Sequence, residues 1–435
     1  MGYQVTFDDL LINKLGEAQY DTEELLGHKV EGIADNDRVL FHRHLSDLSH
    51  YLQEQQSMPV TELAGPRHKL FFQPDEVKMG IVTCGGLCPG LNTIIRSVVY
   101  AADQYYGIKT VYGFRYGYAG LNPEVGQPPM MLNIDIVDNI HTQGGTILGS
   151  SRGPQDAAVM VDYLENLGIN ILFVVGGDGT MRGALALAKE VEKRRKLISI
   201  IGIPKTIDND IAFIKRSFGF ETAVEEATRV IAAAHMEAKG AVNGIGMVKL
   251  MGRDSGFIAA HATMASCVVN FCLIPEAPFS LNKFLADLER RIRARKHAVI
   301  VVAEGAGQEL IPAEKEDFDS SGNKRLQDIG PFLKKEILRY FKERDLEINV
   351  RYIDPSYTIR SIAPTGDDNV FCLLLGQNAV HAAMSGRTAM VVGYRNDHYI
   401  HLPMTLVTRF RKKVEINGRL WKTVLDTTGQ ADFSK

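Results

Sequence analysis

The sequence lacks the features that would place the protein in a membrane, in an oxidising compartment or on nucleic acid. Its 435 residues contain no apolar run approaching the ~20 residues that span a bilayer. Its five cysteines are few, odd in number and scattered, which favours reduced thiols. A formal net charge of −3 gives no basic excess for nucleic acid or an anionic membrane surface. With no secretion signal evident at the N-terminus, we expect a cytoplasmic protein with no membrane and no nucleic-acid partner.

A zinc site is not expected either. Cys84 and Cys88 are spaced C-x₃-C, but neither a second pair nor clustered histidines accompany them. What the chain does contain is ordinary for a large globular protein, with 45% hydrophobic and 23% charged residues. This length is enough for two or three domains.

Apolar strands and amphipathic helices alternate from about residue 77 onward. The strands are expected at 78–83, 109–112, 171–175, 199–203, 246–250, 268–274, 298–303 and 349–353. The helices are expected at 89–105, 157–167, 181–193, 221–238, 255–266, 281–295, 329–341 and 371–384. This alternation predicts the α/β class, with two doubly wound, mostly parallel-sheet (Rossmann-like) domains. Residues 1–75 are mixed polar, and we expect an N-terminal extension that packs on the main body.

Residues with chemical potential follow the expected strands. They form the strings CGGLCPG at 84–90, GSSRG at 149–153, GGDGT at 176–180, PKTIDND at 204–210, MGRDSG at 251–256 and EG at 304–305. Because parallel strands end at one rim of a sheet, such strings converge there. Glycine-rich turns, acids and cations at one rim suit phosphoryl transfer.

Each string alone also has a structural interpretation. GGDGT fits a tight turn after a core strand as well as it fits phosphate binding. Asp208 and Asp210 could cap a turn or the next helix. Arg253 could pair with Asp254, and Glu304 could cap a helix. The joint occurrence after strands favours the functional interpretation.

Three of these strings carry a resemblance to a known family. GGDGT at 176–180, PKTIDND at 204–210 and MGR at 251–253 resemble the motifs of the phosphofructokinases, and the similarity extends from about residue 64 to about residue 390. NAD kinases and diacylglycerol kinase-like lipid kinases also use GGDGT, but they lack the other two motifs. The resemblance implies a glycolytic kinase that phosphorylates the 1-hydroxyl of fructose 6-phosphate.

The resemblance also implies residue roles. Asp208 is expected to be the general base, Lys205 and Arg253 the further catalytic residues, and Asp178 the magnesium-associated carboxylate, with Asp210 near the metal. The ATP-binding residues are expected to be Gly86, Arg152, Gly153, Gly177, Asp178, Gly179 and Thr180. The fructose 6-phosphate residues are expected to be Thr206, Ile207, Asp208, Met251, Gly252, Arg253, Glu304, Arg351, Tyr357, Thr358, Ile359 and Arg360.

Domains and assembly follow from the same resemblance. Residues 76–220, completed by part of 361–435, are expected to form the phosphate-donor domain, and 221–360 the fructose 6-phosphate domain. A homotetrameric, allosteric enzyme is implied. Many bacterial members have an arginine that reaches a neighbouring subunit where this chain has Gly244, with Lys249 as a candidate substitute.

The phosphoryl donor is indicated by two residues with opposite signals. Lys205 is typical of pyrophosphate-dependent members and Gly179 of ATP-dependent members, a mixture that resembles the atypical ATP-dependent clade of the pyrophosphate-type group. A carboxylate at 179 would repel the α-phosphate of a nucleotide, whereas glycine leaves that space open. We therefore predict ATP with Mg²⁺. The alternatives are pyrophosphate, another GGDGT-type kinase acting on NAD or a lipid, and a non-catalytic relative, against which Asp178 and Asp208 argue.

Overall fold

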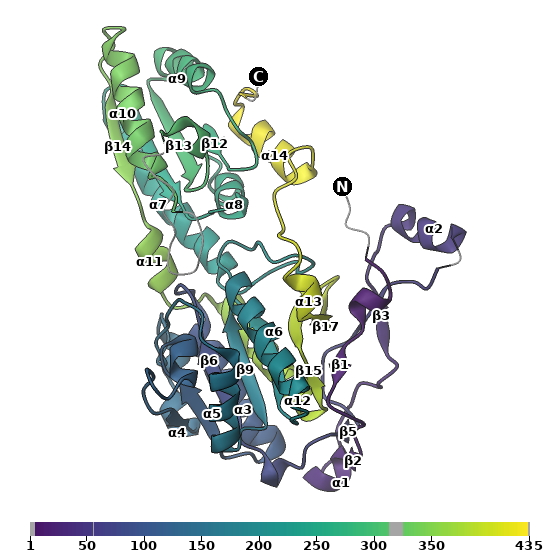
Figure 1. Cartoon of the computed structure of the whole chain (residues 1–435). Helices are drawn as coiled ribbons and strands as arrows, with labels where there is room; N and C mark the ends of the chain where they lie inside the picture. The colour runs from purple at the N-terminus through teal and green to yellow at the C-terminus, as the bar shows by residue number, and fades with distance from the viewer. Residues whose placement is uncertain (1–4, 55, 313–324, 434–435) are drawn as a thin grey trace. The chain divides into compact units, whose positions relative to one another are not determined.

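The computed structural model describes residues 5–54, 56–312 and 325–433, and it divides the chain into two compact units (Figure 1). Unit 1 comprises Met1–Thr206, Ile211–Gly219 and Ile362–Arg411, and unit 2 comprises Ile207–Asp210, Phe220–Ser361 and Lys412–Lys435. The first four residues, on which the expected absence of a secretion signal partly rests, lie outside the described residues. Since the units are defined by packing alone, the functional domain boundaries stay a prediction.

Unit 1 is built on a seven-stranded sheet in the order β17-β16-β10-β9-β6-β7-β8. Its strands are β6 (Met79–Thr83), β7 (Val111–Phe114), β8 (Met130–Leu132), β9 (Ile171–Gly176), β10 (Ser199–Pro204), β16 (Met390–Arg395) and β17 (His398–Pro403). The strands from β16 to β7 are parallel, while β17 and β8 pair antiparallel at the two edges. The central strands β6, β9 and β10 are buried along their whole length, which explains their mainly apolar sequences.

Helices pack around this sheet. They are α3 (Leu91–Tyr106), α4 (Ile134–Val137), α5 (Ala157–Leu167), α6 (Asp178–Lys193), α12 (Gly366–Met384) and α13 (Met404–Val407), with the short 3-10 helices η3 (Gly117–Leu121) and η4 (Ile140–Thr142). Helix α3 packs against α12, and α5 against α6. Helix α5 begins where the Asp156 side chain accepts the N–H of Ala158 and ends at Gly168, which has a left-handed φ of 68°.

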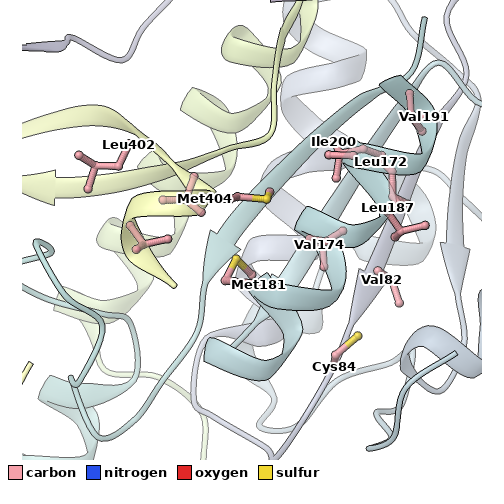
Figure 2. Close-up of a cluster of buried hydrophobic side chains, with 14 of the residues drawn as sticks. Val82, Cys84, Leu172, Val174, Met181, Leu187, Val191, Ile200, Leu402 and Met404 are labelled. Atoms are coloured by element: carbon pink, nitrogen blue, oxygen red, sulfur yellow. The ribbon is translucent and has the colours of Figure 1, made fainter. Parts of the chain in front are cut away.

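Figure 2 shows the part of the core that fixes α6 on the sheet. Met181 and Leu187 come from α6, and Leu172 and Val174 come from the central strand β9. All four side chains are buried. Because α6 begins directly after β9, this packing fixes the position of the turn that joins them.

Residues 5–76 form short elements that belong to unit 1. They are η1 (Asp8–Leu10), β1 (Asn13–Lys14), β2 (Tyr20–Asp21), α1 (Thr22–Leu26), β3 (Arg38–Leu40), α2 (Leu45–Gln53), β4 (Val60–Glu62), β5 (Lys69–Leu70) and η2 (Pro74–Glu76). Strand β1 pairs antiparallel with β15 (Arg387–Thr388), and Leu63 bridges Ile400 of β17. This segment is therefore paired with the C-terminal part of unit 1.

Unit 2 is built on a four-stranded, all-parallel sheet in the order β12-β13-β11-β14. Its strands are β11 (Gly244–Leu250), β12 (Phe271–Leu273), β13 (His297–Ala303) and β14 (Asn349–Ile353). Its helices are α7 (Phe220–Gly240), α8 (Phe257–Ser266), α9 (Leu281–Arg295), α10 (Ile329–Lys342), α11 (Ser356–Ser361) and α14 (Arg419–Thr428), with the 3-10 helix η5 (Gln308–Leu310). Helix α7 packs against α8, and α9 against α10.

The two units together confirm the predicted fold class of two mostly parallel, helix-covered sheets. Within the described ranges, no helix is both long and apolar enough to cross a bilayer.

Candidate active site

In unit 1, the turns that follow β6 and β10 meet beside the end of β9. The backbone N–H of Cys84 donates to the Val175 carbonyl at 2.9 Å, and the N–H of Lys205 donates to the Gly176 carbonyl at 2.9 Å. The Lys205 side chain is only 6% exposed, and its ammonium donates to the Gly86 carbonyl at 2.5 Å. The structure thus brings Lys205 to the glycine turn at 85–86.

The loop at 149–153 joins the same turn. The Ser150 hydroxyl donates to the Gly85 carbonyl at 2.6 Å, and the Gly85 N–H donates to the Ser151 carbonyl at 3.0 Å. A Cβ atom at Gly86 would lie 3.7 Å from the guanidinium of Arg152. Arg152 and Gly86 are therefore neighbours, and Gly153 beside them has a φ of 113°, a conformation that favours glycine.

Asp178 is the first residue of α6, directly after the N-cap Gly177. Its Oδ2 atom contacts Arg182 at 2.8 Å and Arg411 at 3.1 Å. The N–H groups that open a helix attract anions because they have no partner within the helix. Gly177 approaches Lys205 closely, since a Cβ atom there would lie 3.2 Å from the Lys205 carbonyl. The helix end and the lysine therefore lie together.

Gly179 and Thr180 occupy different surroundings at this helix end. A Cβ atom at Gly179 would meet nothing among the described residues within 4 Å, so packing does not require glycine there. Thr180 is 9% exposed, and its carbonyl accepts the Tyr118 hydroxyl at 2.6 Å. The open space beside the α6 terminus is thus on the side of Gly179.

In unit 2, the turns after β11 and β13 pack on one another. The Glu304 N–H donates to the Leu250 carbonyl at 2.9 Å, and the Gly305 N–H donates to the Gly252 carbonyl at 3.1 Å. Gly305 lies against Arg253, because a Cβ atom there would lie 1.8 Å from the Arg253 carbonyl. Met251 is buried, and Gly252 has a φ of 129°, so this turn depends on glycine at two positions.

Three other acids lie near enough to Asp208 for their charges to act on it. We call Asp208, Asp210, Asp254 and Glu304 the acid cluster. Burial raises the pKa of Asp208 well above its ordinary value, and the charges of the other three acids raise it further. A hydrogen bond from the Arg253 backbone N–H acts in the opposite direction. Burial likewise raises the pKa of Glu304, against the charges of Lys249 and Arg253. The cluster therefore contains carboxyl groups that favour the proton-bound form.

The predicted sugar-phosphate residues between β14 and α11 differ in their contacts and in their exposure. Arg360 stacks over the Tyr357 ring at 4.4 Å, and its charge lowers the pKa of Glu304. The Tyr357 side chain is 76% exposed. Thr358 is also exposed, whereas Ile359 is buried in the core. Arg351 is exposed on β14 and pairs with Glu237 at 3.7 Å.

Gly244 and Lys249 lie at opposite ends of β11. A Cβ atom at Gly244 would lie 2.1 Å from the Ala238 carbonyl, so an arginine does not fit there. Lys249 is 9% exposed and its ammonium contacts Asp328 at 3.0 Å and Asp354 at 2.8 Å. Lys249 is therefore a buried cation that pairs with two aspartates.

Three cations beside the predicted residues, Arg182, Arg411 and Lys412, were not predicted from the sequence. Arg182 lies one helical turn after Asp178, and this i, i+4 spacing of opposite charges is a signal that could have found it. Arg411 is 233 residues from Asp178, so no local pattern connects them.

The start of α6 fits magnesium as it is commonly bound beside substrate phosphates. No group of three or more His, Cys, Asp or Glu side chains that could hold a metal ion occurs in the described part of the chain. Mg²⁺ is usually held by one or two carboxylates together with substrate phosphates and water. Asp178 at a phosphate-attracting helix end fits that donor set.

The chain is similar to proteins of one known family. The family model "Phosphofructokinase" matches residues 78–383, more than half of the chain. The ATP-dependent 6-phosphofructokinase of Borreliella burgdorferi is 50% identical over 380 residues, covering 85% of each chain. The Trypanosoma brucei brucei enzyme of the same name is 45% identical over 429 residues, covering 98% of this chain and 88% of that one.

A solved structure is similar in fold. It is a pyrophosphate-dependent phosphofructokinase from Marinobacter aquaeolei, with a TM-score of 0.67 and 21% identity, covering 81% of this chain and 91% of that chain. At that identity the likeness concerns the fold alone.

Proposed function

The chain belongs to the phosphofructokinase family, and we propose that it transfers the γ-phosphate of ATP to the 1-hydroxyl of fructose 6-phosphate. It is a phosphotransferase of glycolysis. The geometry that carries the proposal is the contact of Lys205 with Gly86 and Gly177, beside the start of α6 that bears Asp178. Asp208, at the centre of the acid cluster, follows Lys205 by three residues in the sequence. Lys205 itself belongs to the phosphate-attracting turns of unit 1.

Asp208 acts as the general base. Its carboxylate takes the proton of the sugar 1-hydroxyl as that oxygen attacks phosphorus. A base works best when its pKa lies near the operating pH, and the direction of the Asp208 shift is toward neutral pH. The N–H of Arg253 orients the carboxylate, and the other acids keep its proton affinity high.

The turns of unit 1 hold the phosphate donor. Lys205, Arg152 and the N–H groups that open α6 attract the phosphates, and the glycine turns let the backbone approach them. We assign Gly86, Gly153, Gly177, Gly179 and Thr180 to this lining. Bound Mg²⁺ would neutralise charge on the donor phosphates, and Asp178 is the residue that would hold it.

The turns of unit 2 hold the acceptor. Glu304 and the Met251, Gly252 and Arg253 turn position the sugar, together with Thr206 and Ile207 of the motif at 204–210. We assign Arg351, Tyr357, Thr358, Ile359 and Arg360 to the sugar-phosphate end. Because the Ile359 side chain is buried, we assign the contact with the sugar phosphate to its backbone.

ATP is the proposed donor because the space at Gly179 is open. A nucleotide α-phosphate fits beside a glycine N–H, whereas a carboxylate there would repel it. Pyrophosphate is the second candidate, because the cation of Lys205 attracts phosphate from either donor and excludes neither. The proposal extends to a cytoplasmic, allosteric homotetramer on the family resemblance alone, and light scattering tests the tetramer.

A paired donor assay tests the function. The purified chain receives fructose 6-phosphate and Mg²⁺ with either ATP or pyrophosphate, and fructose 1,6-bisphosphate is measured. We expect turnover with ATP. Turnover with pyrophosphate alone would contradict the donor assignment. Binding of fructose 6-phosphate without turnover would contradict catalysis, and phosphorylation of NAD or a lipid instead would move the chain to another kinase class.

A further inference from the structure

We propose that Arg411 and Lys412, two consecutive residues near the C-terminus, are positioning residues of the phosphoryl-transfer site. Arg411 holds the carboxylate of Asp178, and Lys412 holds Asn209 next to the base Asp208. Both residues lie beyond the region 78–383 that matches the family model. The inference rests on the proposed function.

The backbone places this pair alongside the motif at 204–210. Arg411 forms an antiparallel bridge with Ile211, and the Lys412 N–H donates to the Asp210 carbonyl at 2.8 Å. Two residues further on, the Val414 N–H donates to Glu276 at 2.8 Å. Glu276 also accepts the N–H of Gly256 at 3.1 and 3.0 Å. The segment 411–414 is thus tied to the base-bearing loop and, through Glu276, to the end of the turn at 251–256.

Arg411 fixes the direction of the Asp178 carboxylate. Its guanidinium contacts Oδ2 at 3.1 Å, and Arg182 contacts the same oxygen at 2.8 Å. Two cations on one oxygen restrain the rotation of the carboxylate. Groups that hold a ligating carboxylate commonly govern its affinity for the metal and its charged ligand. Arg411 differs from Arg182 because its backbone is itself paired with Ile211.

Lys412 supports a strained residue between Asp208 and Asp210. Asn209 has a φ of 55°, in the left-handed region that costs energy for residues other than glycine. The Lys412 ammonium donates to the Asn209 side-chain oxygen at 3.0 Å, and Asn209 is 6% exposed. Lys412 also lies 5.1 Å from the centre of the Phe257 ring. Because the Asn209 backbone sets the directions of both neighbouring carboxylates, holding it positions the base.

The test of Arg411 compares Arg411→Met with Arg409→Met. Arg409 lies two residues earlier and pairs with Asp9 at 3.2 Å, so its loss removes one arginine from the same segment. The dissociation constant of Mg-ATP is measured by calorimetry. We expect Arg411→Met to weaken binding ~10–100-fold, Arg411→Lys to restore part of it, and Arg409→Met to leave it unchanged. Equal constants for the two methionine variants would overturn the role of Arg411.

The test of Lys412 compares Lys412→Met with Lys413→Met, since Lys413 is exposed. We expect Lys412→Met to lower kcat ~10²-fold with little change in the KM for fructose 6-phosphate, and Lys412→Arg to recover part of it. Hydrogen exchange of the amides at 204–211 should rise in Lys412→Met alone. Unchanged kcat and exchange would overturn the role of Lys412.

An epistasis test separates positioning from general damage. Glycine adopts a φ of 55° without support, so Lys412→Met should cost much less kcat in an Asn209→Gly background than in the wild type. Equal losses in the two backgrounds would assign Lys412 a merely structural role.

The proposed function is tested separately by wild-type turnover with ATP and fructose 6-phosphate. If the wild type shows none, the function fails, while calorimetry and hydrogen exchange still decide the two residue roles.

Discussion

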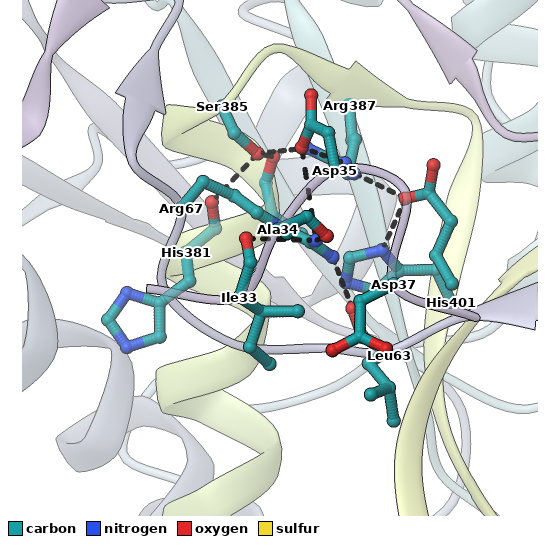
Figure 3. Close-up of polar contacts among 12 residues, drawn as sticks. Ile33, Ala34, Asp35, Asp37, Leu63, Arg67, His381, Ser385, Arg387 and His401 are labelled. Carbon is teal, nitrogen blue, oxygen red and sulfur yellow. Dashed lines mark hydrogen bonds and ion pairs between the residues drawn. The ribbon is translucent and has the colours of Figure 1, made fainter. Parts of the chain in front are cut away.

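Two groups of buried carboxylates, one in each unit, have pKa values shifted in opposite directions. In unit 1, Glu62 contacts Arg387 at 2.5 Å and His401 at 3.1 Å. Figure 3 labels these two partners, Arg387 and His401. Burial alone would raise the pKa of Glu62, but these two partners outweigh it and hold the pKa well below its ordinary value. In the acid cluster of unit 2, burial and like charges act together and raise the pKa of Asp208.

The partners explain the difference. Arg387 also contacts Asp35 at 3.0 Å, and Arg67 lies 3.8 Å from the same carboxylate. We call Asp35, Glu62, Arg67, Arg387 and His401 the ion network; it joins residues 35–67 to the C-terminal part of unit 1. Compensated carboxylates of this kind serve the fold, because each charge has a fixed partner. A carboxyl group surrounded by like charges is costly to the fold and is typical of a reaction site.

Replacing Asp208 by asparagine should have the largest effect. Asp208→Asn keeps the shape of the side chain but removes the base, so kcat should fall ~10²–10⁴-fold, measured by the coupled assay with ATP. Calorimetry should show that fructose 6-phosphate still binds. The corresponding change in the ion network, Glu62→Gln, should leave kcat unchanged. Comparable losses of kcat in both variants would contradict the distinction between the acid cluster and the ion network.

Breaking the ion network should affect stability instead. Arg387 is 1% exposed, so Arg387→Met leaves the buried Glu62, and the exposed Asp35 beside it, without their main cation. The unfolding free energy should fall by about 3–5 kcal/mol, measured by denaturant titration. Arg38 also contacts Glu62, at 3.1 Å, but is 32% exposed. Arg38→Met should therefore cost about 1 kcal/mol or less; a larger loss there than for Arg387→Met would contradict the account.

The buried His401 gives unit 1 a specific pH dependence. Burial lowers the pKa of His401 from 6.5 to about 4, so the unfolded state binds more protons between those values. Stability should therefore rise with pH from about 4 to 6.5, by about 3 kcal/mol at most.

The variant His401→Gln should flatten this rise, because glutamine does not titrate. The same substitution at His398, an exposed residue of β17, should leave the slope as in the wild type. A slope in His401→Gln equal to that of the wild type would show that another group causes the rise.

Adding a carboxylate to the donor turn should have the smallest effect of the four. Gly179→Asp enters open space, so the protein should fold, but its charge should raise the KM for ATP about tenfold. Gly179→Ala adds a Cβ atom to the same space without charge, and its KM should stay near that of the wild type. If both variants raise the KM for ATP equally, the size of the side chain at position 179, and not its charge, controls ATP binding.

Much of the fold could be predicted because its signals are local. The expected helices 157–167 and 281–295 match α5 and α9 at both ends, and the buried strands β6, β9 and β10 stand out as apolar runs. The hairpin of β16 and β17 was not predicted, nor was the antiparallel strand β8. The two edge strands, β8 and β17, are mixed in burial, so their sequences lack both a continuous apolar run and strict alternation.

The candidate site divides in the same way. Lys205 and Gly86 could be placed together, because each follows a strand of one parallel sheet. Arg411 could not, since its contact with Asp178 spans 233 residues. The contact between Arg387 and Glu62 spans 325 residues and could not be predicted from the sequence either. Charge pairing across such separations depends on tertiary packing, and no spacing rule encodes it.

The central claim is that burial and the charges of three neighbouring acids raise the pKa of Asp208. Above its ordinary value of about 3.9 and up to its raised value, the folded state binds more protons than the unfolded state. The contribution of Asp208 is therefore fully present below that window and is lost as pH rises through it.

The direct measurement is the unfolding free energy of the wild type and of Asp208→Asn across this pH range. We predict that the two curves diverge as pH rises, with Asp208→Asn becoming the more stable protein. Curves that stay parallel, or a variant that becomes less stable with rising pH, would contradict the account.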